Sequence, residues 1–172
     1  MFTLHIGNFQ DAERLLTESS NWAGVVSIGD PDQPPPSGLE TCDRYLRREF
    51  HDVDARFRLP QSVLLARAEH VAAILEFFEA TGDGPMLVHC SSGVSRSTAC
   101  AFIGLCQAYG PGREREALEV VLAVRPRALP NRLIVELADE HLGRGGAMVS
   151  VVDEHRADWR REGIALAAVM KG

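Results

Sequence analysis

Short apolar runs alternate with longer stretches of helical spacing along this chain. Continuous apolar runs bounded by glycine, proline or polar residues are typical of buried parallel strands, whereas apolar positions spaced three and four apart predict amphipathic helices. The runs predict strands at 4–6, 24–28, 45–53 and 86–89. The helical spacing predicts helices at 10–16, 61–79, 97–109, 113–124 and 131–142.

Alternation of strands and helices predicts an α/β fold, with a mostly parallel central sheet of about four to five strands and helices on both faces. We expect one domain over residues 1–145, followed by a C-terminal extension at 146–172. Apolar positions between 149 and 170, among them Ile164, Leu166 and Val169, predict a last helix. That helix either packs on the domain or serves association, and the pattern leaves both open.

The net charge of the 172-residue chain is −6, and Lys171 is its only lysine. This balance gives no basic surface for nucleic acid or for an anionic membrane, so we expect neither as a partner. No apolar run approaches the roughly 20 residues of a membrane span, and the N-terminus lacks a basic leader region. The four cysteines have neither disulfide nor metal-ligand spacing, so we expect a reducing cytoplasm and no metal or other cofactor.

One segment carries recognisable chemistry: His89-Cys90 follows the fourth strand, and Arg96 lies at the start of the next helix. A helix N-terminus presents unpaired N–H groups and a partial positive charge, which bind anions and favour a thiolate at Cys90. Arg96 can clamp two oxygens of a tetrahedral dianion, and Gly93 permits a turn with positive φ. The expected phosphate-binding residues are Ser91, Ser92, Gly93, Val94, Ser95 and Arg96.

The order His-Cys, five residues, Arg and then Ser or Thr resembles the signature loop of the cysteine-dependent protein tyrosine phosphatases. Gly93 and Ser97-Thr98 are most similar to the dual-specificity branch, and segments 50–54 and 130–131 to a group of predicted bacterial tyrosine phosphatases. The resemblance implies a metal-independent hydrolase of phosphomonoesters, with Cys90 as nucleophile and a phosphocysteine intermediate. It also implies that the Ser97 hydroxyl steadies the sulfur and that His89 orders the loop.

The leaving oxygen of the ester needs a proton, which a carboxylic acid above the loop can supply. The resemblance implies an aspartate some tens of residues before the cysteine, and Asp52 fits best, with Asp54 as the alternative. It further implies that Arg125 and Asn131, near the end of the domain, support the signature loop. The alternative interpretation of these two residues is that they cap a helix or are exposed to solvent.

The substrate class is less defined than the chemistry. The sequence lacks the Asn-Arg-Tyr segment that lines the deep slot of the larger tyrosine phosphatases, so we expect a shallower pocket for a phosphorylated protein or a small phosphate ester. A non-catalytic phosphate-recognition module becomes the better reading if both aspartates lie away from the loop. A sulfurtransferase or arsenate reductase is a further alternative, but Cys100 and Cys106, on an apolar helix, are badly placed to resolve Cys90.

Overall fold

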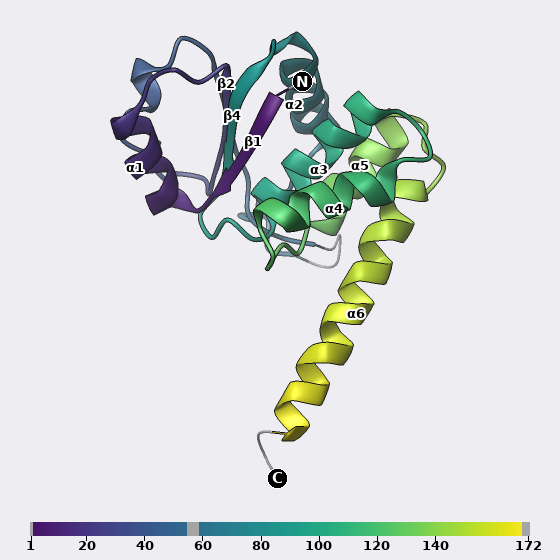
Figure 1. Cartoon of the computed structure of the whole chain (residues 1–172). Coiled ribbons are helices and arrows are strands. Elements are labelled where there is room, and N and C mark those ends of the chain that lie inside the picture. The colour runs from purple at the N-terminus through teal and green to yellow at the C-terminus, as the bar shows by residue number, and fades with distance from the viewer. Residues whose placement is uncertain (1, 55–58, 170–172) are drawn as a thin grey trace.

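The computed structural model describes residues 2–54 and 59–169, and the side chains of residues 3–54 and 59–161. A single sheet of four parallel strands, in the order β1-β4-β2-β3, forms its centre (Figure 1). The strands are β1 (Phe2–Gly7), β2 (Gly24–Gly29), β3 (Tyr45–Glu49) and β4 (Gly84–His89). The expected α/β fold with a parallel sheet is confirmed.

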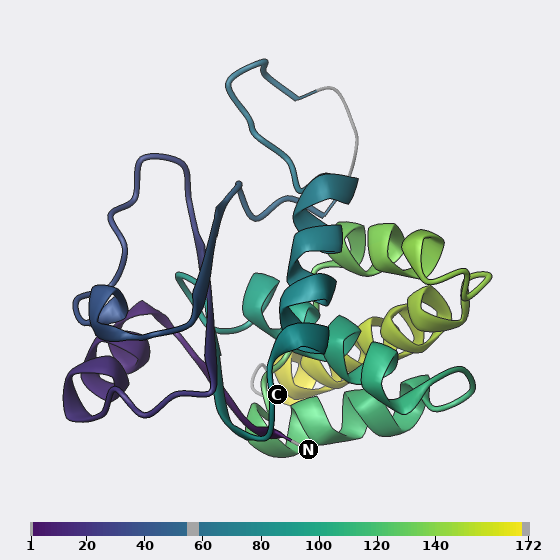
Figure 2. The ribbon, with the colours of Figure 1, turned by 90° about the horizontal axis from the view of Figure 1, so that it is seen from above.

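Helices cover both faces of this sheet. The helical elements are α1 (Phe9–Glu18), η1 (Leu39–Thr41), α2 (Ala68–Ala80), α3 (Arg96–Tyr109), α4 (Glu114–Val124), α5 (Arg132–His141) and α6 (Ala147–Val169). Seen from above, α1 and the short η1 lie on one side of the sheet and α2 to α6 lie on the other (Figure 2). The central position of β4 therefore places its carboxyl end between elements from both layers.

Two apolar clusters hold the layers together. On one face, Val26 and Val88 contribute to a large core that includes the interior of α3, where Ala99 to Ile103 have no exposed surface. On the other face, Val25 and Leu87 pack against α1 and η1. Successive side chains of a strand point to opposite faces, which is why a continuous apolar run is needed in a sheet covered twice.

The segment between β3 and α2 differs from the prediction. The third strand ends at Glu49 rather than at residue 53, and α2 begins at Ala68 rather than at residue 61. His51 N–H donates to the Leu64 carbonyl and its ring Nδ1 accepts from Leu64 N–H, so a loop is closed where the apolar spacing suggested helix. Leu64, which falls within the predicted helix 61–79, is 43% exposed.

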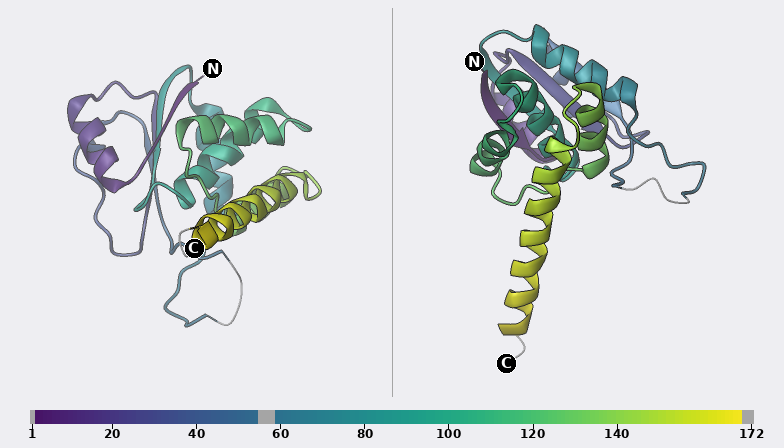
Figure 3. Two further views of the ribbon diagram at one scale, coloured as in Figure 1. Left: turned by 60° about the horizontal axis from the view of Figure 1, so that its bottom comes forward. Right: turned by 90° about the vertical axis from the view of Figure 1, so that its right-hand side faces the viewer.

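The last helix, α6, leaves the body of the domain. Its first turns pack through the buried Met148 and Val152, whereas its far end projects beyond the other elements (Figures 1 and 3). Met170 and the side chains of Ile164, Leu166 and Val169 lie outside the described residues. Within the described chain, no helix is both long and apolar enough to cross a membrane.

Candidate active site

The segment after β4 forms a loop that backbone hydrogen bonds fix on two opposite sides. Cys90 N–H donates to the Gly7 carbonyl (3.4 Å), at the end of β1, and the Ser91 carbonyl accepts from Phe9 N–H (3.3 Å). On the opposite side, the Val94 and Ser95 carbonyls accept from Leu129 (2.9 Å) and Asn131 (3.2 Å) N–H groups. The loop therefore lies at the carboxyl edge of the sheet, where ligands bind in parallel α/β folds.

Cys90 is fully buried at the base of this loop. Its Sγ accepts a hydrogen bond from Gly93 N–H at 3.2 Å and lies 3.2 Å from Ser97 Oγ. Both groups can donate to a thiolate, which is the reactive form of cysteine. The expected contact between Ser97 and the sulfur is thus present.

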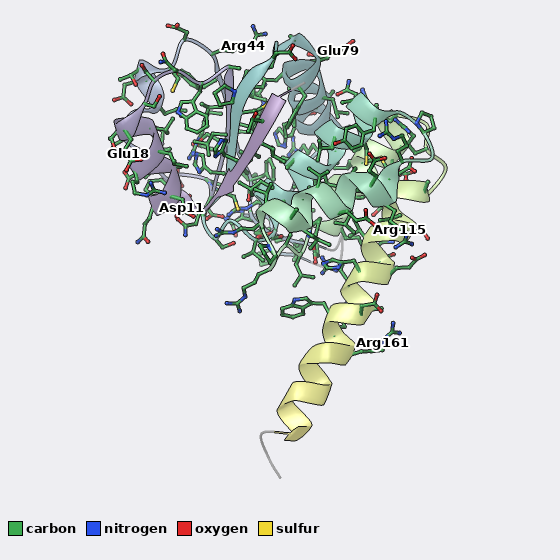
Figure 4. The ribbon with its side chains drawn as sticks, in the orientation of Figure 1. Asp11, Glu18, Arg44, Glu79, Arg115 and Arg161 are labelled. Carbon is green, nitrogen blue, oxygen red and sulfur yellow. The ribbon has the colours of Figure 1, made fainter. Side chains whose placement is uncertain are left out.

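Gly93 makes the turn of the loop, with φ +71°. A Cβ there would lie 2.7 Å from Asn8 N and 2.8 Å from Arg125 Nη2, so a side chain would collide with both. Arg125 Nε donates to the Gly93 carbonyl (3.1 Å), and its Nη1 lies 3.5 Å from Asp11 Oδ2. Asp11 lies in the first turn of α1 (Figure 4). Arg125 therefore ties the turn to the opposite layer.

Arg96 is 2% exposed and its guanidinium is anchored at the ends of two strands. Nη1 donates to the Phe50 (2.6 Å) and Gly29 (3.1 Å) carbonyls, and Nη2 donates to Ser91 Oγ (3.0 Å). Its Nε is buried without a hydrogen-bond partner. A buried, unpaired guanidinium N–H is costly, and an anion held by the loop would satisfy it.

Asp30 also contacts this guanidinium, which the sequence analysis did not foresee. Its Oδ1 is 3.0 Å from Arg96 Nη1, and its Oδ2 accepts from Arg96 Nη2 (3.3 Å) and Ser91 Oγ (2.9 Å). Burial raises the pKa of Asp30, but the hydrogen bonds from Arg96 and Ser91 outweigh it and lower the pKa below its usual value. An acidic residue directly after the buried β2, parallel to β4, was the signal available in the sequence.

The two candidate acids lie in different surroundings. Asp52 Oδ1 accepts from Ser95 Oγ (2.6 Å) and Asn131 Nδ2 (2.8 Å), and its Oδ2 is 3.9 Å from Arg96 Nε. Asp54 instead accepts from Arg132 N–H (2.9 Å) and forms an ion pair with Arg156 of α6. Asp52 therefore faces the signature loop, whereas Asp54 is engaged by the helices behind it.

His89 is buried under the loop, with Nε2 2.7 Å from Ser27 Oγ. Arg47 Nη1 donates to the same hydroxyl at 2.9 Å. Burial and the Arg47 charge lower the pKa of His89 to about 4, against a hydrogen bond with the Cys90 backbone. The ring is therefore neutral at physiological pH, which suits the ordering role expected of it.

The remaining cysteines are buried away from solvent. Cys100 and Cys106 lie inside α3, and Cys42 lies under η1 in the smaller core. Burial raises the pKa of Cys106 to about 12 and raises that of Cys100 as well. Neither thiol on α3 has the thiolate character that attack on a Cys90 adduct requires.

Comparison with solved structures identifies this architecture. The phosphatase domain of Yvh1 from Chaetomium thermophilum superposes with a TM-score of 0.60 at 21% identity, over 84% of this chain and 93% of that one. Human DUSP28 gives 0.56 at 22% identity, over 81% and 91%. A mouse putative dual specificity phosphatase, complexed with zinc tungstate, gives 0.58 at 21% identity, over 84% of each chain.

At these identities the comparisons establish the fold, which is that of the dual-specificity phosphatases, as the signature loop led us to expect. No protein-family model and no curated protein sequence matches the chain. Activity therefore has to be argued from the residues of the site.

Proposed function

We propose that this protein is a cysteine-dependent phosphatase that hydrolyses phosphomonoesters in two steps without a metal ion. The observation that carries the proposal is the convergence of three groups on one loop: the Cys90 sulfur, the Arg96 guanidinium and the Asp52 carboxyl. A nucleophile, an anion clamp and a proton donor are the groups that cleavage of a phosphate ester needs.

In the first step, the Cys90 thiolate attacks phosphorus, an S–P bond forms and the P–O bond to the leaving group breaks. The carboxylic acid of Asp52 donates its proton to the departing oxygen. In the second step, water attacks the phosphocysteine, Asp52 takes a proton from that water, and the S–P bond breaks to release inorganic phosphate. Ser97 Oγ donates to the sulfur as it leaves as a thiolate.

Charge on the transferring phosphoryl group would be met by the backbone N–H groups of the loop and by Arg96. Such fixed donors act without reorganisation at the moment of reaction, so they stabilise the transition state more than water does. The anchoring of Nη1 by two backbone carbonyls leaves Nε facing Asp52 and the loop. We assign Nε, which has no hydrogen-bond partner among the described residues, to one phosphoryl oxygen, and Nη2 to a second one in exchange for its contacts with Ser91 and Asp30.

Asp52 is the preferred acid because Ser95 and Asn131 hold it against the loop through hydrogen bonds. Asp54 instead forms an ion pair with Arg156. The same placement weighs against a phosphate-recognition module without turnover, which would lack an acid at the loop. The burial of Cys100 and Cys106 weighs against an enzyme that needs a resolving cysteine. Four free cysteines also suit a reducing compartment, and we propose the cytoplasm.

A phosphorylated protein or a small phosphate ester is the proposed substrate. One solved neighbour, PTPMT1, is described in complex with PI(5)P; it gives a TM-score of 0.55 at 17% identity. The loop of the present chain has no lysine, and its variable positions are Ser91, Ser92, Val94 and Ser95, so no cation besides Arg96 is offered to further phosphates from within it. This favours a monophosphate over an inositol polyphosphate.

Hydrolysis of p-nitrophenyl phosphate in the presence of EDTA tests the proposal. We expect turnover by the wild-type protein and none above background by Cys90→Ser. Activity retained by Cys90→Ser, or an inactive wild-type protein that is folded, would contradict it. Cys42→Ser, a substitution of a buried cysteine outside the loop, is the matched control and should keep turnover.

A further inference from the structure

Helix α6 lies along the segment that carries Arg125 and Asn131. His155 Nε2 is 2.9 Å from the Ala128 carbonyl, and Arg156 Nη1 donates to the Pro130 carbonyl at 2.9 Å. Trp159 follows these residues at helical spacing, so it extends the same face toward the signature loop. The C-terminal extension therefore forms part of the wall around the candidate site.

A cavity of about 660 Å³ lies at this junction. Its lining includes Ser92, Val94, Arg125, Arg127, Leu129 and Trp159. Two of these belong to the phosphate-binding loop, so the cavity adjoins that loop. It thus lies where the portion of a substrate beyond its phosphate ester can be held.

The cavity combines an aromatic surface with a free positive charge. Trp159 is 42% exposed, one of few large apolar side chains so exposed among the described residues. Arg125 is engaged by the Gly93 carbonyl and Asp11. Arg127 is exposed and makes no hydrogen bond or ion pair within the described chain, although the protein as a whole is acidic. Tryptophan and arginine are the residues most enriched where binding energy concentrates.

We propose that this cavity binds the residues next to the phosphorylated side chain of a protein substrate, with an apolar side chain against Trp159 and a carboxylate beside Arg127. The inference rests on the proposed phosphatase function and specifies its substrate. Charge complementarity to Arg127 calls for an acidic group, and the exposed indole with Leu129 and Val94 calls for an apolar one. A peptide with a leucine and an aspartate beside its phosphotyrosine supplies both.

Fluorescence provides a direct test, because the chain has two tryptophans and Trp22→Phe leaves Trp159 alone. In a Cys90→Ser, Trp22→Phe background, three probes are titrated: inorganic phosphate, a phosphotyrosine peptide flanked by leucine and aspartate, and its counterpart flanked by alanine and lysine. We expect the first peptide to change the Trp159 emission and to bind roughly 10-fold more tightly than the second, about the value of one well-placed side-chain contact. Inorganic phosphate should bind without that change.

Variants assign the preference to the cavity. Arg127→Ala, with Trp159 retained, should abolish the discrimination between the peptides, and so should Trp159→Ala when binding is followed by calorimetry. Arg161→Ala, on the same helix but directed into solvent (Figure 4), should leave it intact. Turnover of p-nitrophenyl phosphate by Arg161→Ala in the otherwise wild-type chain should remain at the wild-type level.

Equal affinity of the two peptides, with phosphate binding intact, would overturn this inference and leave the phosphatase proposal standing. Tighter binding of an inositol polyphosphate than of either peptide would also overturn it. Failure of every phosphorylated probe and of inorganic phosphate to bind the folded protein would contradict the proposed function itself.

Discussion

The signature loop and the acid segment meet at one site but are built by different means. Residues 90–96 form a short loop with Cys90 and Arg96 buried in it, and backbone hydrogen bonds fix it to both layers of the fold. The segment that carries Asp52 has no regular structure and is held near the loop by side chains of Ser95 and Asn131. The nucleophile and the anion clamp are thus products of a local strand–loop–helix unit, whereas the acid depends on distant parts of the chain.

This difference predicts two kinds of sensitivity to substitution. Changes at Cys90 and Arg96 should remove catalysis, because these two buried side chains supply the nucleophile and the anion clamp. Changes in the acid segment should reduce catalysis in proportion to how much the leaving group needs a proton.

The largest effect is expected at Arg96. Arg96→Lys loses the planar pair of donors and leaves the Phe50 and Gly29 carbonyls without their guanidinium partner. We expect kcat/KM for p-nitrophenyl phosphate to fall by about 10³-fold, at the upper end of the usual cost of one transition-state donor. A lysine variant within 10-fold of wild type would show that the guanidinium does not bind the phosphoryl group.

Substitution of each aspartate in turn distinguishes the proposed acid, Asp52, from the alternative, Asp54. Asp52→Asn should lower kcat for an alkyl phosphate by roughly 10²-fold, with a smaller loss for p-nitrophenyl phosphate, whose leaving group needs little protonation. Asp54→Asn, the matched control, keeps one acceptor oxygen and loses the ion pair with Arg156, away from the loop. It should change kcat by less than about 3-fold. The reverse ranking, measured with the same alkyl ester, would transfer the acid role to Asp54.

Asp30 offers a sharper test of how Arg96 is held. Its lowered pKa keeps the carboxylate ionised near neutral pH, so it places a negative charge beside the anion site. Because Arg96 stays anchored by two carbonyls in Asp30→Asn, we expect inorganic phosphate to inhibit this variant roughly 10-fold more strongly, as like charges no longer repel. Weaker inhibition would show instead that Asp30 is needed to orient Arg96.

A last effect, on stability rather than on activity, is a pH dependence that arises from His89. Its pKa falls from 6.5 to about 4 on folding, so the unfolded chain binds a proton first as the pH drops. Stability is therefore complete above pH 6.5 and declines toward pH 4, by roughly 2–3 kcal/mol between pH 7.5 and 4.5. Denaturant unfolding of the wild-type protein and of His89→Asn checks this. Over the same pH range, the free energy of unfolding of the variant should fall by that much less. Parallel pH profiles would contradict it.

The sequence predicted the buried parts of this molecule better than the exposed ones. The apolar run of β4 and the nearly all-apolar α3 left little choice of structure, and the loop between them was therefore placed correctly. Residues 50–53 were predicted as strand and residues 61–67 as helix, but β3 ends at Glu49 and α2 begins at Ala68. The apolar residues of 61–67 follow a helical spacing, while the backbone there pairs Leu64 with His51. A contact between residues this far apart leaves no trace in local periodicity.

The site shows the same contrast. The grouping of residues around Cys90 was expected from one stretch of chain. The proximity of Arg125 and Asn131 to the loop was expected from the resemblance. Asp30 and Ser27 were not, because their contacts with Arg96 and His89 exist only once β2 lies beside β4. The position of Asp30 after a buried parallel strand could have suggested it, but nothing in the sequence points to Ser27.

The central claim is that Cys90 carries the phosphoryl group during turnover, and mass spectrometry of acid-quenched protein tests it most directly. Ser97→Ala should slow breakdown of the intermediate, because the sulfur loses the hydroxyl 3.2 Å away that steadies it as a leaving group. With p-nitrophenyl phosphate as substrate, we predict one added phosphoryl group in this variant, located on the peptide that contains Cys90. Turnover of substrate with no covalent phosphoryl group on Cys90, or with the group on another residue, would contradict the account.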